Sequence, residues 1–478
     1  MTTDLTAFVK AYDVRGLVPE QLNVDVAWAL GAAFADEIVL PDGAPAVVIG
    51  HDMRPSSPEL SRAFAEGVRS RGLDAVLIGL ASTDGLYFAS GRLELPGAMF
   101  TASHNPAAYN GIKLCRAGAR PVGQDSGLAA VRDTAQALLD SGDTTPRGER
   151  PGELREQDLL ADYAAFLRGL VDLSGSRPLT VVVDAGNGMG GHTVPAVLGT
   201  GAGLPSLPLE VVELYFELDG TFPNHEANPL EPENLRDLQA AVREHGADLG
   251  LAFDGDADRV FVVDERGEAV SASAITAMIA EREIAKEVAS GRPEAEVAIV
   301  HNVISSHAVP EVIAEQGARA VRTRVGHSFI KAEMASAAAV FGGEHSAHYY
   351  FRDFWFADTG MLAALHVLAA LGEQARPLSE LMAGYERYAA SGEINSRVDD
   401  VPAATERVRA WAVEQGVEID ELDGLTAVHA GGEGDPMWWL NLRASNTEPL
   451  LRLNVEAADA ATVARVRDDV LTLVRGTS

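Results

Sequence analysis

The sequence has only one cysteine, Cys115, in 478 residues. A single cysteine forms no disulfide within the chain and builds no cysteine-rich zinc site. We therefore expect Cys115 to be a small residue of the hydrophobic core. The composition suits a reducing compartment.

Basic residues are scarce relative to acidic ones. Lys and Arg number 38 against 70 Asp and Glu, which gives a formal net charge of −32. Such a surface repels the phosphate backbone of nucleic acids and anionic membranes, so we expect neither as a partner. An anionic small-molecule substrate must then be bound at a local basic site.

Long hydrophobic runs are also lacking. The longest helix-like apolar stretch, residues 361–371, is too short to span a bilayer, and the N-terminus has no signal-peptide pattern. We predict a cytoplasmic protein with no membrane partner. At this length, and with 47% hydrophobic residues, the chain is expected to form about three or four domains.

Three segments repeat one plan, in which an apolar strand-like run ends in a loop, a helix-like stretch follows, and a second strand-like run comes next. The first strands are predicted at residues 46–50, 181–184 and 297–300. The second strands are predicted at residues 75–79, 209–216 and 318–325. A third apolar run in each segment breaks into a polar loop, and these loops span residues 101–106, 254–259 and 343–348. Because ligands gather beyond strand ends in α/β units, three such units around one cleft would bring the loops together.

The last hundred residues follow a different plan. Strands are predicted at 437–442 and 450–455, with a polar loop between them and a final helix at 459–475. This pattern indicates a smaller α+β domain. From the glycine, proline and charge shifts we predict four domains, at residues 1–152, 153–259, 260–375 and 376–478.

The first loop, Thr101-Ala-Ser-His-Asn-Pro106, places the hydroxyl of Ser103 beside the imidazole of His104. Taken alone, this pattern fits either a reactive serine or an ordinary turn in which small polar side chains bond to nearby backbone. The other loops decide between the two.

The second loop sets three carboxylates, Asp254, Asp256 and Asp258, between two apolar runs. Three like charges in so short a loop repel one another unless a cation joins them, and hard oxygen ligands favour Mg²⁺ or Ca²⁺. An EF-hand is excluded because Arg259 stands where that loop requires glycine and because the flanks are strand-like. A solvated acidic turn is the alternative to a metal site.

The remaining polar loops suit a sugar phosphate. Gly343-Glu-His-Ser-Ala-His348 offers groups that hydrogen-bond sugar hydroxyls and move a proton. Arg443-Ala-Ser-Asn-Thr-Glu-Pro449 offers a guanidinium, hydroxyls and an amide, which suit a dianionic phosphate, although a plain hairpin turn is the alternative. Tyr12, Arg15 and Lys113 are weaker signals by themselves.

Together, the motifs TASHNP, DGDADR, GEHSAH and RASNTEP, with KAYDVRG near the N-terminus, resemble the α-D-phosphohexomutases, specifically the bacterial phosphomannomutase/phosphoglucomutase branch. The four motifs occur in the family's order at domain-scale spacing, so the resemblance covers nearly the whole chain. The resemblance implies four domains around a central cleft, three of them similar mixed α/β units. The last would be a smaller α+β domain like the TATA-binding protein.

The resemblance also assigns roles to residues. Ser103 would carry the phosphoryl group and contribute to the metal site, in which Mg²⁺ is held by Asp254, Asp256 and Asp258. The groups around the transfer would be His104, Lys113, Arg15 and Arg259. Glu344 and Ser346 would bind sugar hydroxyls. The phosphate that does not react would be held by Arg443, Ser445, Asn446 and Thr447. Further substrate or proton-transfer contacts would be Tyr12, His327 and His348.

The implied enzyme is an isomerase that interconverts the 1- and 6-phosphates of mannose or glucose. It would work through a phosphoserine and a hexose 1,6-bisphosphate, with Mg²⁺, as a monomer or dimer. A phosphoglucosamine mutase is the alternative within the family. A Mg²⁺-dependent sugar phosphatase and a non-catalytic sugar-phosphate binding protein are the alternatives outside it.

The sequence departs from the family pattern in the third repeat. Ile304 stands where some relatives carry a lysine, and Arg324 or His307 are the candidates to replace that contact. His345 and Ala347 also differ from the residues that the family often has in the sugar loop, residues 343–348. The change at Ile304 leaves one substrate contact of the family without an assigned residue.

Overall fold

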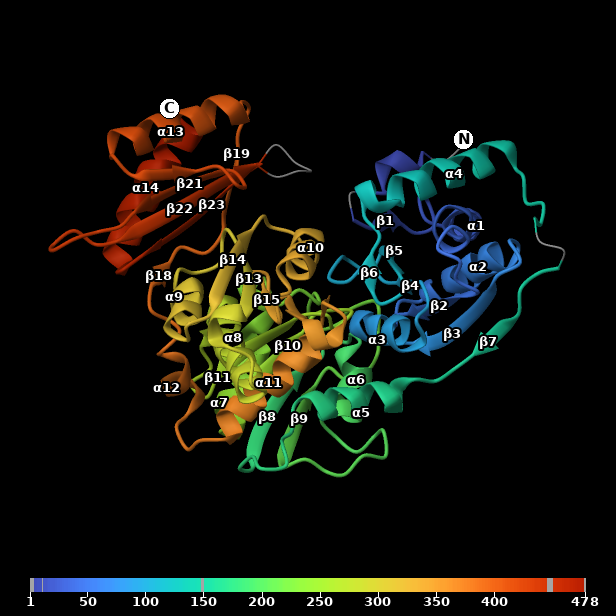
Figure 1. Ribbon diagram of the computed structural model, residues 1–478, viewed down its shortest axis with the longest axis horizontal. Coiled ribbons are helices and arrows are strands. Elements are labelled where there is room, and N and C mark those ends of the chain that lie inside the picture. The colour runs from blue at the N-terminus through green and yellow to red at the C-terminus, as the bar shows by residue number, and fades with distance from the viewer. Residues whose placement is uncertain (1–3, 11, 148–149, 445–449, 477–478) are drawn as a thin grey trace. The chain divides into compact units, whose positions relative to one another are not determined.

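The structure is a computed structural model that describes residues 4–10, 12–147, 150–444 and 450–476 (Figure 1). The chain divides into two compact units. Unit 1 comprises Met1–Val270 and Ser346–Leu381, and unit 2 comprises Ser271–His345 and Met382–Ser478. Each unit is described separately below.

The first repeat lies in unit 1 and is built on β2 (Ala46–His51), which pairs in parallel with β3 (Asp74–Leu80) and β4 (Gly97–Phe100). Beyond β4 the sheet continues with β5 (Tyr109–Arg116) and then β1 (Val14–Leu17), and β6 (Arg120–Pro121) also pairs with β5. At the other edge, β7 (Leu154–Glu156) pairs with β3. The helices are α1 (Val24–Phe34), α2 (Ser57–Arg69), α3 (Thr83–Leu93) and α4 (Leu128–Ser141). Helices α1 and α2 pack closely because Gly31 and Gly67 have no side chain at the contact. A Cβ on either glycine would lie 2.1 Å from the backbone of the other helix.

The second repeat, also in unit 1, has the same order. Strand β8 (Leu179–Asp184) pairs in parallel with β9 (Leu209–Leu214) and β10 (Leu249–Phe253). The antiparallel strands β11 (Val260–Asp264) and β12 (Ala269–Val270) extend the sheet beyond β10. Its helices are α5 (Leu160–Leu170), α6 (Gly190–Val197) and α7 (Arg236–His245).

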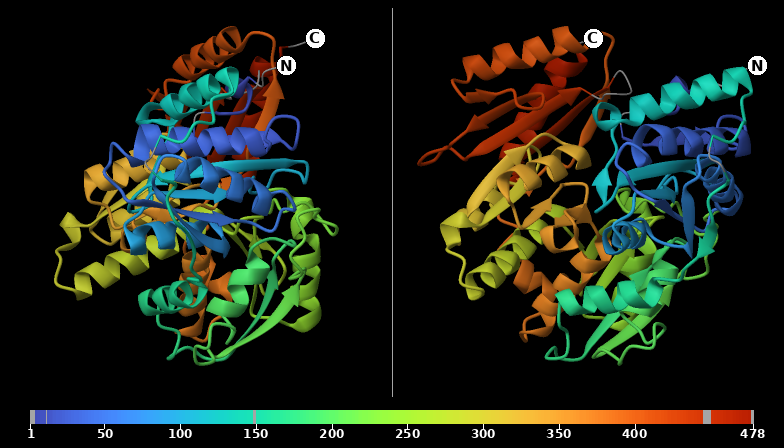
Figure 2. Two further views of the ribbon diagram at one scale, coloured as in Figure 1. Left: turned by 90° about the vertical axis from the view of Figure 1, so that its right-hand side faces the viewer. Right: turned by 45° about the vertical axis from the view of Figure 1, so that its right-hand side comes forward.

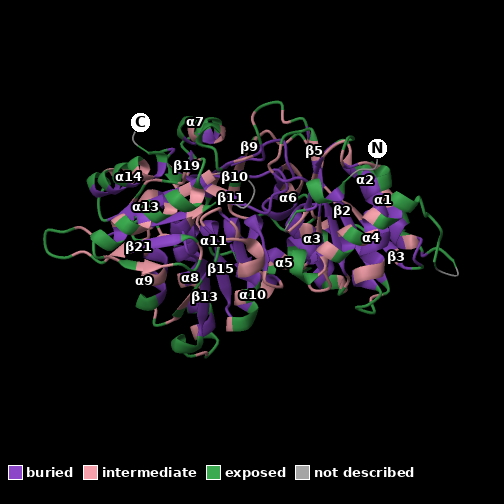
Figure 3. Ribbon diagram, turned by 90° about the horizontal axis from the view of Figure 1, so that it is seen from above, coloured by how far each residue is buried: buried purple, intermediate pink, exposed green. Residues whose placement is uncertain are grey.

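The third repeat lies in unit 2, where β13 (Ala298–Asn302) pairs in parallel with β14 (Arg319–Thr323) and β15 (Phe341–Gly343). Its helices are α8 (Ala272–Ala289), α9 (Ala308–Glu315) and α10 (His327–Ala337). The central strands β2, β8 and β13 are almost wholly buried, and Figure 3 shows this for β2 and β13. The predicted repeat is confirmed, because the three polar loops follow the equivalent strands β4, β10 and β15.

The segment Ser346–Leu381 belongs to unit 1. It contains the antiparallel strands β16 (Tyr349–Phe351) and β17 (Ala357–Asp358), the buried helix α11 (Gly360–Gly372) and most of α12 (Leu378–Met382). An aromatic cluster joins it to both repeats, because the ring of Trp355 stacks on Phe166 of α5 and meets Phe88 of α3 edge-on. A Cβ on Gly91 would lie 2.2 Å from the Trp355 ring, so the close contact requires glycine there.

A buried carboxylate lies beside this aromatic cluster. Asp84, in the first turn of α3, accepts hydrogen bonds from Tyr163 of α5 (2.7 Å), from Thr359 at the start of α11 (2.6 Å) and from Ser82. Burial raises the pKa of Asp84 to about 6, despite these hydrogen bonds. One side chain thus joins three separate parts of unit 1.

The C-terminal part of unit 2 is an antiparallel sheet with the order β18-β23-β22-β21-β20, and β19 also pairs with β23. The strands are β18 (Ala389–Ala390), β19 (Ile394–Arg397), β20 (Glu418–Asp420), β21 (Leu425–His429), β22 (Trp438–Ala444) and β23 (Leu450–Ala457). Helices α13 (Val401–Glu414) and α14 (Ala460–Arg475) lie against this sheet, as Figure 2 shows. The helices and the sheet share a hydrophobic core. The predicted fold class, three similar α/β units followed by a smaller α+β domain, is confirmed.

Among the helices of the described residues, none is long and apolar enough to cross a membrane.

Candidate active site

Ser103 lies in the loop after β4 and is buried, with 3% of its surface exposed. Its backbone has a left-handed φ of 49°, and its N–H donates to Thr101 Oγ1 at 2.9 Å. The Ser103 hydroxyl donates to Asp254 Oδ2 at 2.8 Å. The loops after β4 and β10 therefore meet inside unit 1, as the repeat predicted for two of the three loops.

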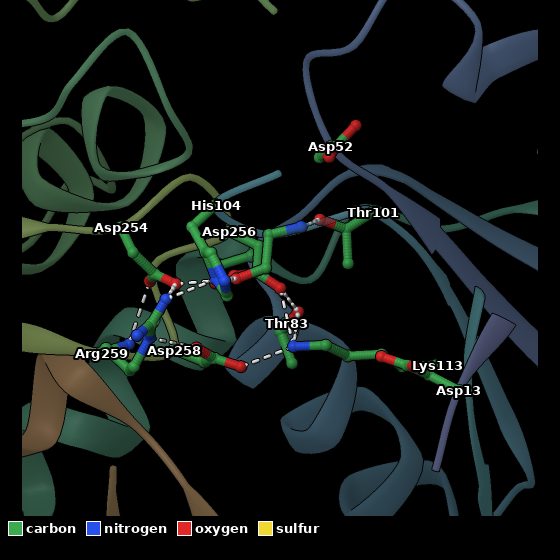
Figure 4. A network of polar contacts seen from close by, with 12 residues as sticks. Asp13, Asp52, Thr83, Thr101, His104, Lys113, Asp254, Asp256, Asp258 and Arg259 are labelled. Atoms are coloured by element: carbon green, nitrogen blue, oxygen red, sulfur yellow. Dashed lines mark hydrogen bonds and ion pairs between the residues drawn. The ribbon is translucent and has the colours of Figure 1, made fainter. Parts of the chain in front are cut away.

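The three carboxylates of the second loop are all buried. Figure 4 shows them in one network of polar contacts with Lys113 and Arg259. The loop turns at Ala257, whose φ is 59°, and continues into β11. Arg259, at the end of the loop, donates to Asp254 Oδ2 through Nη2 at 2.8 Å and through Nε at 3.0 Å. Both bonds reach the oxygen that also accepts from Ser103, so Arg259 holds Asp254 against the serine loop, residues 101–106.

Lys113 supplies a cation between the other two carboxylates. It lies on β5 opposite Met99 of β4, and its Nζ is 2.8 Å from Asp256 Oδ2 and 2.6 Å from Asp258 Oδ2. Burial by itself would lower the Lys113 pKa, but these two carboxylates raise it well above its usual value. The ammonium group therefore stays charged and partly offsets the acidic cluster.

The acidic cluster fits a divalent metal ion. The ligand oxygens of Asp254, Asp256 and Asp258 lie within 4.8 Å of one another. Among the residues that the structure describes, neither Oδ1 of Asp256 nor Oδ1 of Asp258 has a hydrogen-bond partner. Buried carboxylate oxygens without partners are costly unless a cation compensates them, and hard oxygen ligands suit Mg²⁺.

The carboxylates of the cluster titrate differently. Burial and the charges of Asp258 and Asp256 raise the pKa of Asp254 to about 7, against the opposing effect of Arg259. Burial also acts to raise the pKa of Asp256, but Lys113 and a hydrogen bond from Thr83 outweigh it and lower that pKa. In the metal-free cluster, Asp254 therefore takes up a proton at a higher pH than Asp256 does.

His104 accepts a hydrogen bond from Arg259 in this arrangement. The distance from Arg259 Nη2 to His104 Nδ1 is 2.7 Å, and because a guanidinium only donates, Nδ1 is unprotonated. Burial and the charges of Arg259 and Arg15 lower the pKa of His104 well below its usual value. His104 is thus a neutral imidazole, and the Ser103 hydroxyl, 3.2 Å from Nδ1, has its shorter hydrogen bond to Asp254.

Arg15, on β1, reaches the serine loop from another direction. Its Nη1 donates to Asn105 Oδ1 at 2.6 Å, and its Nε donates to Asp13 at 2.8 Å. The negative charge of Asp13 is the largest cause of the raised pKa of Arg15. Tyr12, two residues before β1, is half-buried.

His348 lies near the acidic cluster within unit 1. Its Nδ1 is 2.9 Å from Ser346 Oγ, and its Nε2 is 3.9 Å from Asp258 Oδ1. Ligand atoms of His348, Asp258 and Asp358 lie within 4.8 Å of one another. Of the predicted sugar loop, Ser346 and His348 thus belong to unit 1.

The other predicted residues belong to unit 2. Glu344 is buried after β15 and accepts hydrogen bonds from the Gly326 N–H (3.0 Å) and from Asn302 Nδ2 (3.4 Å). His327 is the first residue of α10, adjacent to Gly326. Arg443 lies near the end of β22, with Nη2 3.8 Å from Glu393. Ser445, Asn446 and Thr447 lie outside the described residues.

The position that departs from the family pattern, Ile304, is buried in unit 2. Of the two candidates to replace the lysine contact, His307 stacks on Trp439 with ring centroids 5.5 Å apart. The backbone N–H of His307 donates to Glu456. Arg324 is exposed and lies over the ring of Phe329. Neither interaction identifies a replacement for the lysine contact.

Sequence reasoning missed two residues of this site. Thr83 donates through Oγ1 to Asp256 Oδ2 at 2.6 Å, and its N–H donates to the Asp256 carbonyl at 3.0 Å. Ser82, which caps α3, is the only local signal, and it identifies a helix start rather than a site. Arg54 donates hydrogen bonds to carbonyl oxygens of the serine loop, but it belongs to no motif that predicts this role.

Four family models match the chain in order. They describe domains I, II and III and the C-terminal domain of phosphoglucomutase/phosphomannomutase, and they match residues 7–138, 161–267, 272–388 and 393–473. The chain therefore belongs to the phosphoglucomutase/phosphomannomutase family.

Individual relatives agree with this assignment. A protein of Xanthomonas campestris named "Phosphohexose mutases" is 41% identical over 475 residues, which cover 99% of this chain and 100% of the relative. A phosphomannomutase of Salmonella typhimurium is 40% identical over 458 residues, 95% of each chain. The crystal structure of a family protein from Burkholderia thailandensis matches with a TM-score of 0.84 at 32% identity, covering 100% of this chain and 99% of that one.

These comparisons confirm the predicted family and, with it, the prediction of a hexose-phosphate mutase and isomerase. The domain boundaries and the roles of single residues stay predictions.

Proposed function

We propose that this enzyme interconverts the 1- and 6-phosphates of mannose or glucose through a phosphoryl group carried on Ser103. The observation that carries the proposal is the hydrogen bond of 2.8 Å from the Ser103 hydroxyl to Asp254, a member of the buried carboxylate cluster. A serine that faces a metal-binding cluster is suited to phosphoryl transfer, which depends mainly on positioning and charge neutralisation.

In the proposed reaction, the bond between Ser103 Oγ and phosphorus breaks as a hydroxyl oxygen of the hexose phosphate bonds to phosphorus. The hydroxyl proton leaves to a base, for which His348 is the candidate, and the departing Ser103 oxygen takes up a proton to become a hydroxyl. The two proton movements reverse when a phosphoryl group returns to Ser103. The product is a hexose 1,6-bisphosphate. After it turns around, its other phosphoryl group returns to Ser103, and the isomeric monophosphate is released.

Asp254, Asp256 and Asp258 would hold Mg²⁺ beside Ser103. The Oδ1 atoms of Asp256 and Asp258 support this assignment, because within the described part of the chain neither accepts a hydrogen bond. When bound, the ion would neutralise charge on the transferring phosphoryl group. Lys113, Arg259 and Arg15 add positive charge from the protein itself, and each lies within hydrogen-bonding distance of the serine loop or the cluster.

The remaining roles follow the family resemblance. Glu344 and Ser346 would bind sugar hydroxyls, with Tyr12 and His327 as further substrate contacts. The phosphate that does not react would be bound by Arg443, Ser445, Asn446 and Thr447. A hexose 1,6-bisphosphate would act as activator, and the partners would be small hexose phosphates in the cytoplasm.

The test is a side-by-side assay of the purified protein with the 1-phosphates of mannose, glucose and glucosamine, each with Mg²⁺ and a hexose 1,6-bisphosphate. We expect 6-phosphates of mannose or glucose to form. Preferential turnover of glucosamine phosphate would identify a phosphoglucosamine mutase instead. Release of inorganic phosphate without an isomer would identify a phosphatase, and binding without turnover a non-catalytic protein.

A further inference from the structure

Arg54 is a fully buried arginine that holds the backbone of the serine loop. Its guanidinium group, between β2 and α2, donates four hydrogen bonds to main-chain carbonyl oxygens. Through Nη2 it bonds to Ser103 (2.8 Å) and Asn105 (2.7 Å), and through Nη1 to Pro106 and Tyr109 (2.9 Å each). These bonds use both N–H groups on each terminal nitrogen.

Arg54 is itself held in place from the side away from the loop. Asp52, also buried, has Oδ2 3.3 Å from Arg54 Nε, while its Oδ1 accepts hydrogen bonds from the Arg54 N–H (3.0 Å) and from Ser57 (2.6 Å). The ring of Phe222, from the second repeat, lies 5.1 Å from the guanidinium carbon. The Arg54 guanidinium is therefore paired with Asp52.

The Ser103 carbonyl is enclosed between Arg54 and the loop that carries the three carboxylates, residues 254–259 (the metal-binding loop). A Cβ on Gly255 would lie 2.4 Å from the Ser103 oxygen, so the carbonyl packs directly on the backbone between Asp254 and Asp256. The neighbouring N–H of Ser103 is held by Thr101. A left-handed φ is strained at a residue other than glycine, so such bonds are needed to maintain it.

We propose that Arg54 is a positioning residue for phosphoryl transfer: it fixes the Ser103 backbone so that Oγ faces Asp254 and the metal-binding carboxylates. The inference rests on the proposed function of Ser103. It differs from a purely structural role, in which Arg54 only contributes folding stability. The direction of Oγ follows from the backbone of its residue, so loosening the carbonyl misplaces the reacting atom without altering the groups that bind the sugar.

The test variant is Arg54→Lys, which keeps the positive charge but cannot form four bonds to carbonyls in a planar fork. We expect kcat to fall about a hundredfold, because small misplacements of reacting groups have effects of that size. KM for the sugar phosphate should stay within about twofold, since the variant leaves the groups that bind the sugar phosphate unchanged. The rate of phosphoryl transfer from the phosphoenzyme in a single turnover should fall as kcat does.

The matched control is Arg71→Lys. Arg71 is likewise buried, and it pairs with Asp36 and bonds to the Thr145 carbonyl, away from the serine loop. We expect this variant to lose thermal stability while its kcat stays near that of the wild type. If Arg54→Lys and Arg71→Lys lose kcat equally, or if Arg54→Lys keeps wild-type kcat, the positioning role is refuted.

A milder variant keeps the inference testable if Arg54→Lys does not fold. Asp52→Asn retains the oxygen that accepts from Ser57 and from the Arg54 N–H but removes the charge that orients the guanidinium. We expect a smaller loss of kcat at unchanged KM; an unchanged kcat refutes the inference. Wild-type enzyme that carries no phosphoryl group on Ser103 contradicts the proposed function itself, so the two failures are distinguishable.

Discussion

The hydroxyl oxygen of Ser103 lies 2.8 Å from Oδ2 of Asp254, although 151 positions separate the two residues in the sequence. The first and second repeats each contribute one loop to this contact, and both loops follow the third parallel strand of their repeat. The proposed chemistry requires this junction, because the first loop supplies the group that carries the phosphoryl and the second supplies the carboxylates that would hold the metal ion.

Asp256 is expected to be essential for metal-dependent turnover. Asp256→Asn removes one negative charge from the cluster and leaves Lys113 with a single carboxylate partner, Asp258. We expect the apparent affinity for Mg²⁺ to fall by about a hundredfold, together with kcat, which is measured in a Mg²⁺ titration of initial rates. The control is Asp264→Asn at the other end of β11, where the carboxylate is buried and paired with Arg266. Equal Mg²⁺ dependence in the two variants would contradict the metal assignment.

His104 is expected to remain neutral across the physiological pH range. Burial, Arg259 and Arg15 lower its pKa below the unfolded value of about 6.5, so the unfolded chain takes up a proton first as the pH falls. Its contribution to stability is therefore present above that value and is lost on acidification. NMR of ¹⁵N-labelled histidine should show no titration of His104 between pH 6 and 8. A midpoint within that interval would show that Arg259 does not fix the neutral form.

His104 substitutions should separate hydrogen bonding from proton transfer. Asn offers a carbonyl oxygen in place of Nδ1, so His104→Asn can still accept from Arg259, whereas His104→Ala cannot. We expect His104→Asn to retain clearly more kcat than His104→Ala. Equal, near-complete loss in both variants would indicate that the imidazole itself takes part in proton transfer.

Asp84 should make the fold more stable in mild acid. Its folded pKa of about 6 exceeds the unfolded value of 3.8, so the folded protein binds the extra proton between these values. The free energy of unfolding therefore gains up to about 3 kcal/mol from this group as the pH falls from above 6 to below 4. In Asp84→Asn this contribution disappears, so the difference in unfolding free energy between variant and wild type should change with pH in that interval. A difference that is independent of pH would contradict the raised pKa.

Arg443 is expected to serve both substrate orientations. Arg443→Ala should weaken binding of the phosphate that does not react by about 2 kcal/mol, which is roughly thirtyfold in kcat/KM. The loss should be similar for the 1-phosphate and the 6-phosphate, measured in both directions. Arg407→Ala, on α13 with its guanidinium bonded to the Leu473 carbonyl, is the control. A loss with only one isomer would show that the loop does not bind both.

Much of the fold could be predicted from the sequence, because apolar runs such as 46–50 and 181–184 form the buried central strands β2 and β8. Two residues predicted from the motifs, Ser103 and Asp254, also meet where the first two repeats bring their loops together. Arg54, Thr83 and Asp84 could not be predicted as they were not part of any motif. Their roles depend on contacts with residues 49 to 275 positions away, which no local pattern encodes.

His104 shows a second limit of sequence reasoning. Its place beside Ser103 first suggests a serine activated by an imidazole, but the Arg259 guanidinium 155 positions away occupies Nδ1. The protonation state of a histidine depends on its tertiary partners rather than on its neighbours in the sequence. The predicted phosphate loop around Ser445 and Asn446 lies outside the described residues, so its arrangement stays a prediction.

The measurement that tests the central proposal most directly is the intact mass of the protein after incubation with a hexose 1,6-bisphosphate and Mg²⁺, for the wild type and Ser103→Ala. We predict one phosphoryl group on the wild type, mapped to Ser103 by peptide fragmentation and transferred to added mannose 6-phosphate. The variant should carry none and should lack mutase activity. A phosphoryl group on another residue, or a Ser103→Ala variant that interconverts the isomers at the wild-type rate, would contradict the account.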